Sequence, residues 1–588
     1  MNLTNFLKQI DVITAQYSAE QLVAFIHDIG RVLPEQGRED FLKRLKAVGN
    51  KTEKEPAKDA KKELEFHKMH QLVRKNLKII DSQEITVKAI WNEDYDDWYD
   101  ESSEEFYYVD DSGVSNMLAE ACDFVHACMD MEQYKEGFQT GNQLLSMEIL
   151  CINEYDGEEL SLGDMVYHEL LHCDLTQVIL DTAYCSYHAV LLKKRPEVLY
   201  GVILNGKKDE VTLEAIMQHG DEDLPDFQVF LTLWIEYLGT KTGHTADRLI
   251  LEAVGLLDDV FAAAQYAEEY AAVHPGLYLN LLESRTNMDA DTIESIGMKA
   301  MKKIPKKYIM RSKVALKTAE YLMETNENLP LRKSCYFVAY ESDTSALNYL
   351  RVLLNGYGTE KGKEELRKIW KKFSVQENGD YYDMRDSAYS ERKQNKPDKN
   401  MILLLQFLDG QFADVLKKGM NKSEALGWSG TFMKQGIALF LLYFYEGPWS
   451  GKGINAMADK VKSAMSFSEE EYQKGTYGRC AANENDLFCE LFLKWKSAVQ
   501  MEPEIRTYAI KKITALLEKR TEGIMEANRR NYYGECAAYI AALGEVRESW
   551  GEDGAKQRLM TSYRDKYPRR SAFREEMSNY GWIDVKRK

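Results

Sequence analysis

From about residue 113 to the C-terminus, the chain keeps one pattern: apolar residues recur at helical spacing in segments of roughly 12–20 residues, separated by short turns. Alternation of β-branched residues, which would indicate strands, is almost absent there. Pro is scarce, at 11 of 588 residues, as expected of packed helices, which tolerate Pro only at turns. The clearest predicted helices are 227–238, 260–273, 314–323, 345–354 and 535–543.

Small residues recur in these segments at spacings of three and four, for example Ala263, Ala267 and Ala271. On one face of a helix they let a second helix approach closely, and bulky Tyr and Leu side chains then fill the remaining space. Similar helix pairs return at irregular intervals of roughly 35–50 residues, which is typical of degenerate helical repeats. We therefore predict an all-α chain in which residues 113–588 form a helical-repeat α-solenoid of TPR- or HEAT-like helix pairs.

The N-terminal part differs from this array. Residues 1–48 are predicted to form a small helical unit, because Leu22, Phe25 and Ile26 recur at helical spacing. Residues 49–112 are predicted to be a charged linker, Lys51–Lys62, followed by an acidic aromatic segment. Within that segment, Ile85–Trp91 is the best strand candidate, and Glu105–Val109 is expected to pair with it.

Charge is divided unevenly in the same region. The formal charge of the chain is −19, so neither nucleic acid nor an anionic membrane is its default partner. Residues 43–78 nevertheless contain 12 basic and 5 acidic residues, and residues 81–111 contain 12 acidic residues and one Lys. The acidic segment is either a solvated loop or a docking surface for a basic partner, which could be the chain's own 43–78 segment.

The sequence gives no sign of export or membrane insertion. The first 30 residues lack the basic start and unbroken apolar stretch of a signal peptide. The longest apolar run, Gly436–Tyr445, has about half the length that spans a bilayer and is predicted to be a buried helix. The nine Cys residues form no Cys-x-x-Cys pair, so we expect most of them to be small buried hydrophobes in a reducing cytoplasm.

Two short stretches carry a family resemblance. Ala339–Leu350 (AYESDTSALNYL) resembles the helix-entry signature of bacterial tetratricopeptide-like arrays, and more specifically the helical regions of bacterial proteins associated with SWIM-type zinc fingers. Tyr567–Met577 resembles the closing segment of those arrays. The resemblance implies an α-solenoid over about residues 150–580. The Cys-x-Cys and Cys-x-His set of that zinc finger is missing, so its nucleic-acid role does not carry over.

One motif has known metal chemistry: His168-Glu169-Leu170-Leu171-His172. On a helix, His168 and His172 would lie on one face and could share a Zn²⁺ ion, while Glu169 could act as general base on the metal-bound water. This is the signature of zinc metallopeptidases. The alternative is a repeat helix over 163–181 that carries two His residues beside a Glu.

A zinc hydrolase also needs a third protein ligand. The sequence leaves that ligand open among Glu197, Glu210, Glu214 and His188. A second set, Cys122, His126 and Cys128, has spacings that do not share one helical face, so we predict no metal site there.

The C-terminal residues 556–588 are basic, with 10 basic and 4 acidic residues among interleaved aromatic residues. They are predicted to cap the repeat array, since a terminal repeat needs a polar outer face. Alternatively, they could bind single-stranded nucleic acid. The cations that would face it are Lys556, Arg558, Arg564, Arg569 and Arg570.

Taken together, these features predict a non-catalytic cytoplasmic scaffold without a cofactor, which binds a protein or peptide in the groove of its helical repeats. The first alternative is a zinc-dependent metallohydrolase that uses His168, Glu169 and His172. The second alternative is an accessory factor in a bacterial nucleic-acid-handling or defence system, acting through the C-terminal cations.

Overall fold

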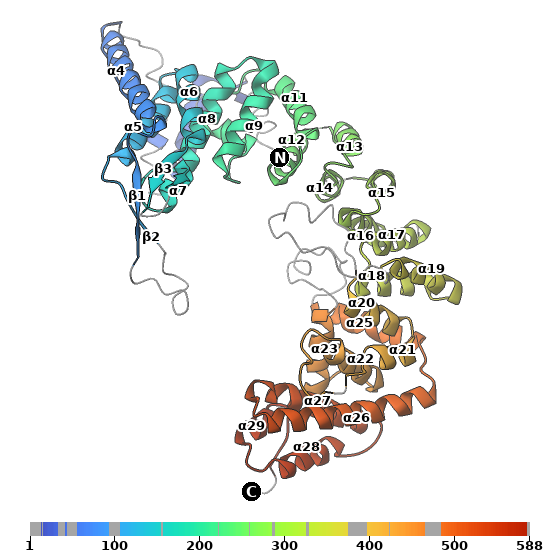
Figure 1. Cartoon of the computed structure of the whole chain (residues 1–588). Helices are drawn as coiled ribbons and strands as arrows, with labels where there is room; N and C mark the ends of the chain where they lie inside the picture. The colour runs from blue at the N-terminus through green and yellow to red at the C-terminus, as the bar shows by residue number, and fades with distance from the viewer. Residues whose placement is uncertain are drawn as a thin grey trace. The chain divides into compact units, whose positions relative to one another are not determined.

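The chain divides into two compact units, unit 1 (Met1–Ala263) and unit 2 (Ala264–Lys588). The structure is a computed structural model that describes residues 13–14, 16–32, 41–43, 56–92, 106–153, 157–220, 223–257, 259–284, 288–324, 329–373, 397–422, 424–464 and 484–584. Helices dominate both units, and the described strands form one small sheet (Figure 1). The prediction of a mainly helical chain is thus confirmed. The domain boundaries predicted at residues 48 and 112 stay predictions.

Unit 1 contains the sheet and the helices that support it. Its helices are α2 (Ala19–Val32), α4 (Pro56–Asp81), α5 (Val114–Asp130), α6 (Tyr134–Ser146), α7 (Leu162–Tyr167), α8 (Leu175–Ala189), the 3-10 turn η2 (Leu192–Lys194), α9 (Arg195–Gly206), α10 (Leu213–His219), α11 (Phe227–Gly239) and α12 (His244–Gly255). Its strands are β1 (Val87–Trp91), β2 (Phe106–Val109), β3 (Ile149–Ile152) and β4 (Gly157–Leu160).

Helices α5, α6 and α8 pack on one another and form the centre of unit 1 (Figure 1). Two glycines on α6 allow this close approach. A Cβ added at Gly141 would lie 2.0 Å from Oγ1 of Thr182 on α8, and one added at Gly137 would lie 2.7 Å from Sγ of Cys185. Since Thr182 and Cys185 are fully buried, α6 and α8 can keep this separation only where α6 has no side chain.

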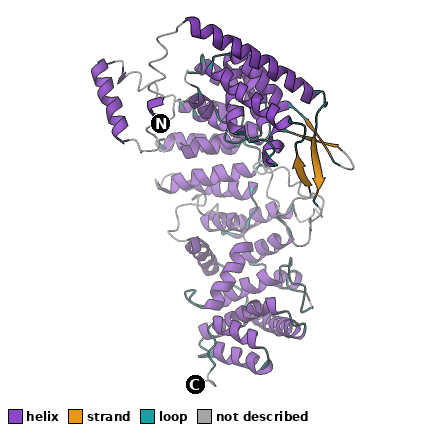
Figure 2. Cartoon of the chain, turned by 90° about the vertical axis from the view of Figure 1, so that its left-hand side faces the viewer, coloured by secondary structure: helices purple, strands orange, loops and turns teal. Residues whose placement is uncertain are grey.

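The sheet has the strand order β2-β1-β3-β4, and its strands lie together in unit 1 (Figure 2). β1 pairs antiparallel with β2, Ile90 opposite Tyr107, and parallel with β3, Lys88 opposite Ile152. This pairing of β1 with β2 confirms the predicted strand pair. The antiparallel hairpin β3–β4 lies within the part of the chain predicted as a helical array. Its strands are only four residues long, so they leave little alternation to detect.

A single carboxylate fixes the junction between β2 and α5. Asp110 accepts hydrogen bonds from the backbone N–H groups of Gly113 at 2.8 Å and Ser115 at 2.6 Å, which are free donors at the start of a helix. Burial alone would raise the pKa of Asp110, but the hydrogen bonds from Ser115, Val114 and Gly113 outweigh it and lower that pKa. The edge strand β2 is therefore held firmly against the helices.

The basic helix α4 includes part of the predicted charged linker Lys51–Lys62. Residues 56–62 are its first turns, whereas residues 51–55 lie outside the described part of the chain. Ala, Lys and Glu have high helix propensity, and Pro56 stands at the first helical position, where its missing N–H is harmless. α4 packs on α5, and the ring of Phe66 stacks on Phe124 with centroids 5.2 Å apart.

Unit 2 is helical throughout its described residues. Apart from α13 (Val260–Glu269), which begins in unit 1, its elements are α14 (Gly276–Ser284), α15 (Ala290–Lys303), α16 (Ile309–Glu324), α17 (Leu329–Ser342), α18 (Ala346–Val352), the π-turn η3 (Leu353–Tyr357), α19 (Glu360–Lys371), α20 (Lys399–Leu408), α21 (Phe412–Lys418), α22 (Met433–Phe444), α23 (Lys452–Ala464), α25 (Glu484–Ala498), α26 (Pro503–Glu526), the 3-10 turn η5 (Arg530–Tyr532), α27 (Tyr533–Ser549), α28 (Ala555–Lys566) and α29 (Ser571–Asn579). Helices α11, α13, α16, α18 and α27 cover most of the five segments predicted as helices.

Small residues have the packing role in unit 2 that the sequence predicts. A Cβ added at Gly453 on α23 would lie 2.4 Å from the backbone nitrogen of Ala542, so α23 and α27 approach at backbone contact. The apolar run Gly436–Tyr445 lies mostly in α22 and is almost wholly buried, as predicted. Among the described helices, none combines the length and the apolar character that a membrane span needs.

We predict that Gly141→Ala destabilises unit 1 by about 1–3 kcal/mol, because the new methyl group would collide with a Thr182 side chain that has no room to move. The matched control is Gly201→Ala on α9, where an added Cβ meets no atom within 4 Å. That control should be neutral or stabilising by up to about 1 kcal/mol. Chemical denaturation of both variants measures the difference, and equal stabilities would contradict the packing described for α6 and α8.

Candidate functional site

The predicted zinc motif, residues 168–172, lies between two helices and not on one. α7 ends at Tyr167, and α8 begins at Leu175. Asp174 starts α8 as its N-cap, since its Oδ1 accepts the N–H of Gln177 at 3.1 Å. The helix predicted over 163–181 is therefore wrong across this connection.

Backbone geometry explains why α7 stops where it does. Glu169 adopts a left-handed conformation with φ of 57°, and its N–H donates to the carbonyl of Val166 at 3.2 Å. The N–H of Leu170 donates to the carbonyl of Met165 at 3.0 Å. These two bonds form a Schellman cap, a helix ending whose left-handed position is usually Gly. The residue proposed as general base is thus the left-handed residue of a helix cap.

The two histidines of the motif point to different surroundings. The ring of His168 stacks on Tyr108 of β2, with centroids 3.8 Å apart. His172 is exposed in the connection before α8, and so is Glu169 beside the cap. Because the connection is not helical, the histidines do not share the single helical face that the metallopeptidase motif requires.

The candidate third ligands do not complete the site either. Glu197, Glu210 and Glu214 are exposed on or beside α9 and α10, and the ring of His188 stacks on Tyr134 at 4.5 Å. Across the described ranges, no three His, Cys, Asp or Glu side chains are arranged to hold a metal ion. The zinc site stays a prediction, and no described geometry supports it.

A buried carboxylate on α8 is the strongest polar feature that the sequence analysis missed. Asp181 is fully buried, and its Oδ1 lies 2.6 Å from Nε2 of His219, while its Oδ2 lies 3.1 Å from Nδ1 of His126. Gln177 donates to the same carboxylate at 3.3 Å. Asp181 therefore joins α5, α8 and α10. The sequence signal that could have revealed this cluster is an Asp within an apolar helix. A buried carboxylate needs hydrogen-bond partners, so such an Asp indicates polar side chains packed against it.

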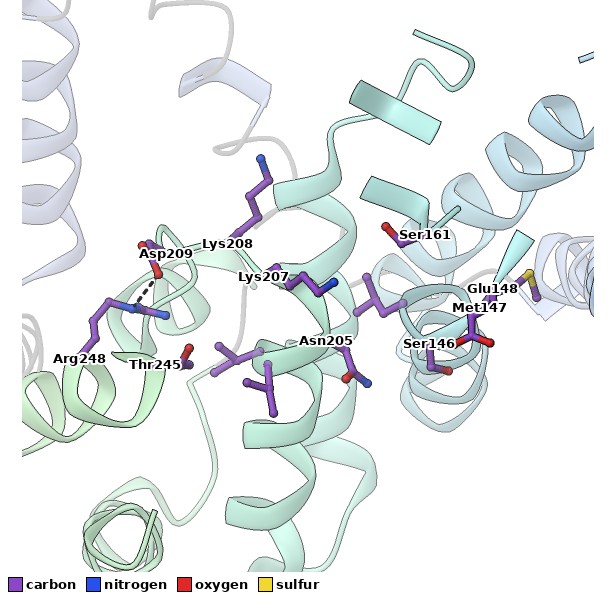
Figure 3. A pocket seen from close by; sticks show the side chains of 13 residues that line it. Ser146, Met147, Glu148, Ser161, Asn205, Lys207, Lys208, Asp209, Thr245 and Arg248 are labelled. Atoms are coloured by element: carbon purple, nitrogen blue, oxygen red, sulfur yellow. Dashed lines mark ion pairs between the residues drawn. The ribbon is translucent and has the colours of Figure 1, made fainter. Parts of the chain in front are cut away.

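A pocket of about 560 Å³ opens in unit 1 between the ends of α6 and α9, the start of α7, and α12 (Figure 3). Its charged lining mixes both signs: Lys207, Lys208 and Arg248 with Glu148 and Asp209. Arg248 is already engaged by Asp209 at 3.5 Å. The two lysines follow the C-terminal end of α9, where cations are favourable for the helix itself. We therefore base no function on this pocket.

Most of the C-terminal cations predicted to face nucleic acid form ion pairs or hydrogen bonds within unit 2. Four of them contact the chain: Lys556 contacts Glu545, Arg558 the carbonyl of Asp553, Arg564 the carboxylate of Asp565, and Arg570 the amide oxygen of Asn528. Arg569 is exposed. These contacts favour the capping interpretation, and nucleic-acid binding stays a prediction.

The two faces of the sheet in unit 1 differ in exposure. On the inner face Val87, Ala89 and Cys151 are buried, while Trp91 at the end of β1 is 44% exposed. On the opposite face, which we call the outer face, the side chains are Lys88, Ile90, Tyr107, Val109, Leu150, Ile152 and Glu159. The apolar side chains of Ile90, Tyr107 and Ile152 remain 51%, 56% and 44% exposed there. A solvated sheet face normally carries polar residues, so this apolar face is unusual.

The chain that joins β1 to β2 is acidic in composition. The connection between β1 and β2, residues 92–105, contains eight Asp or Glu residues and no Lys or Arg. Residues 93–105 lie outside the described part of the chain. On β4, Glu159 is exposed on the outer face, whereas Glu158 lies on the inner face and accepts a hydrogen bond from the Tyr108 hydroxyl at 3.2 Å. The single cation of the 81–111 segment, Lys88, is paired with Asp111 at 2.9 Å. The segment that carries β1 and β2 is therefore strongly anionic.

The comparisons with family models and curated proteins assign no role to these features. Neither a protein-family model nor a curated protein sequence matches the chain. Ala339–Leu350, on which the resemblance to SWIM-associated helical regions depends, covers the end of α17 and the start of α18 and is almost wholly buried. Its residues thus have a packing role, and the family resemblance stays a prediction.

We predict that Glu169→Gly stabilises the protein by roughly 0.5–1 kcal/mol, because Gly adopts the left-handed conformation without the steric cost of a Cβ. The matched control is Glu197→Gly, an exposed Glu in the first turn of α9, which should lower stability by about 1 kcal/mol. Thermal unfolding of both variants checks the pair. A loss of stability in Glu169→Gly equal to that in Glu197→Gly would show that residue 169 is helical, as a zinc-binding helix requires.

Proposed function

We propose that this chain is a protein-interaction scaffold that docks a basic, partly apolar segment of another protein on the outer face of its sheet. The observation that carries the proposal is the row of exposed apolar side chains on β1, β2 and β3, in a sheet whose first two strands are joined by a strongly acidic connection. The helices of unit 1 hold this sheet in place.

The apolar part of the surface supplies affinity. Ile90 and Tyr107 stand directly opposite each other on adjacent strands, so their side chains form one continuous contact surface. Full burial of an exposed side chain of this size contributes about 1.5–3 kcal/mol. Ile90 and Tyr107 are about half exposed, so each can contribute about half of that, and Tyr is enriched among the residues that dominate binding energy. A partner with apolar side chains on alternate positions of an extended segment would match the pleat of the sheet.

The negative charge of this segment favours one class of partner. With Lys88 neutralised by Asp111, the acidic connection 92–105 and Glu159 on β4 attract cations and repel acidic proteins. A basic segment is therefore the occupant that the surface favours. Helix α4, which carries much of the chain's own basic segment, is packed on α5, so we propose a separate protein as partner.

The wider scaffold remains part of the proposal. We propose that the helix pairs form the predicted α-solenoid, whose groove would provide a second contact surface. The metallohydrolase built on His168, Glu169 and His172 gains no support from the geometry of the connection between α7 and α8. Nucleic-acid handling gains none from the C-terminal cations, because most of them contact the chain itself.

The test uses a fluorescently labelled ten-residue peptide of alternating Lys and Leu and, as its acidic counterpart, the same peptide with Glu in place of Lys. We expect saturable binding of the Lys peptide, measured by anisotropy, that weakens with added salt, and no binding of the Glu peptide. The variant Ile90→Ser/Tyr107→Ser should weaken binding by tenfold or more, since about 1.4 kcal/mol corresponds to a factor of ten.

The control is Val229→Ser on α11, because Val229 is as exposed as Tyr107 but lies outside the sheet. It should leave binding unchanged. Equal binding of the two peptides, or equal affinity in the sheet variant and the wild type, would contradict the proposal. Competition by a peptide of residues 43–55, or dimerisation of the chain that blocks the Lys peptide, would identify a different occupant and overturn it.

A further inference from the structure

Helix α4 carries exposed cations along its outer side. Residues 64–81 contain four Lys or Arg side chains, and all four are exposed: Lys68, Arg74, Lys75 and Lys78. Glu65 and Asp81 are the only acidic residues in this stretch. The helix lies at the edge of unit 1 (Figure 1). It therefore presents a positive surface, although the formal charge of the whole chain is −19.

The helical period places three of these cations in one row. At about 100° per residue, Lys68, Lys75 and Lys78 lie within about 80° of one another around the helix axis. The opposite side carries Phe66 and Val73, which are buried where α4 packs on α5. With a rise of about 1.5 Å per residue, the three lysines span about 15 Å along the helix. We call them the lysine row.

The lysine row has no ion-pair partner among the described residues, and neither has Arg74 at its edge. A second basic run, residues 299–311, differs in this respect. There Lys303 pairs with Glu268 at 3.0 Å, and Arg311 pairs with Glu341 at 2.8 Å. Cations that the described part of the fold leaves unneutralised are available to an anion from outside the chain.

The residue types beside the lysine row match phosphate groups. Lys is depleted and aromatic residues are enriched in protein–protein interfaces, whereas Lys and Arg make many of the contacts to nucleic-acid phosphates. Phe66 is the only Phe, Trp or Tyr in residues 64–81, and it is buried. An exposed aromatic side chain on which the bases of a single strand could stack is therefore missing from this stretch.

A duplex also fits the row better than a membrane does. Double-stranded DNA carries one phosphate charge per about 1.7 Å of its axis, so a row of about 15 Å faces several phosphates at once. An amphipathic helix binds a membrane by inserting its apolar side, and the apolar side of α4 is buried against α5. At 0.1 M salt the Debye length is about 10 Å, so the acidic residues far from α4 oppose binding only weakly.

We propose that the outer side of α4 binds the phosphate backbone of a double-stranded nucleic acid, independently of base sequence. The ammonium groups of Lys68, Lys75 and Lys78 contact phosphate oxygens, and the release of condensed counterions favours the complex. This site is separate from the C-terminal cations and from the outer face of the sheet. It stands independently of the proposed docking function.

The test measures binding of the full-length chain to a fluorescently labelled 20-base-pair DNA duplex by anisotropy, from 50 to 200 mM salt. The logarithm of the association constant should fall with the logarithm of salt concentration with a slope of about −3, since each of the three lysines releases about 0.9 counterion. The variant Lys68→Gln/Lys75→Gln should weaken binding at 50 mM salt by tenfold or more and reduce the slope to about −1. Gln has a helix propensity close to that of Lys, and both positions are exposed, so the variant should fold.

The matched control is Lys511→Gln/Lys519→Gln, which makes the same charge change at two exposed positions of α26 and should leave duplex affinity unchanged. The sheet variant Ile90→Ser/Tyr107→Ser should also bind the duplex as the wild type does, so this proposal and the docking proposal fail separately. Absence of duplex binding at 50 mM salt would overturn the proposal. So would equal losses of affinity in the α4 and α26 variants, or binding to phosphatidylserine vesicles in place of the duplex.

Discussion

The structure of unit 1 depends on the close packing of α6 against α8. Gly137 and Gly141 give α6 a side without side chains, and buried Thr182 and Cys185 of α8 occupy that space. The same helix α8 carries Asp181, whose carboxylate ties α5 and α10 to it. Packing and hydrogen bonding thus act on one helix, which fixes the frame that supports the sheet.

This frame of helices determines which residues of the sheet are buried and which are exposed. Asp110 caps α5 and so anchors β2 at the edge of the sheet. The inner face is covered, and its residues Val87 and Ile149 are buried. The outer face is left to solvent although Ile90 and Tyr107 are apolar. A face with this composition lowers its free energy when another surface covers it, and the acidic composition of the connection between β1 and β2 favours a basic surface.

Sequence reasoning predicted what local patterns determine. The helices 227–238 and 535–543 and the strand pair at Trp91 and Phe106 follow from periodicity, and the structure confirms them. The helix predicted across residues 168–174 was wrong. Two helix caps lie in this connection, and one of them has Glu169 at the left-handed position where Gly is usual. The spacing of apolar residues alone does not reveal such a cap.

The features that matter most for function depend on tertiary contacts. The strands could be predicted, but which of their two faces stays exposed is set by the helices that cover the other one. Likewise, the contacts of Asp181 with His126 and His219 join residues distant in sequence. With a single sequence, no spacing rule links such residues.

The central claim is that the outer face of the sheet is where a basic segment binds. Hydrogen–deuterium exchange of the full chain, with and without the Lys-Leu peptide, locates the contact directly. The account predicts slower exchange at residues 87–91, 106–109 and 149–152 when the peptide is bound, with the helices of unit 2 unchanged. Slower exchange confined to helices, with the sheet unaffected at saturating peptide, would contradict it.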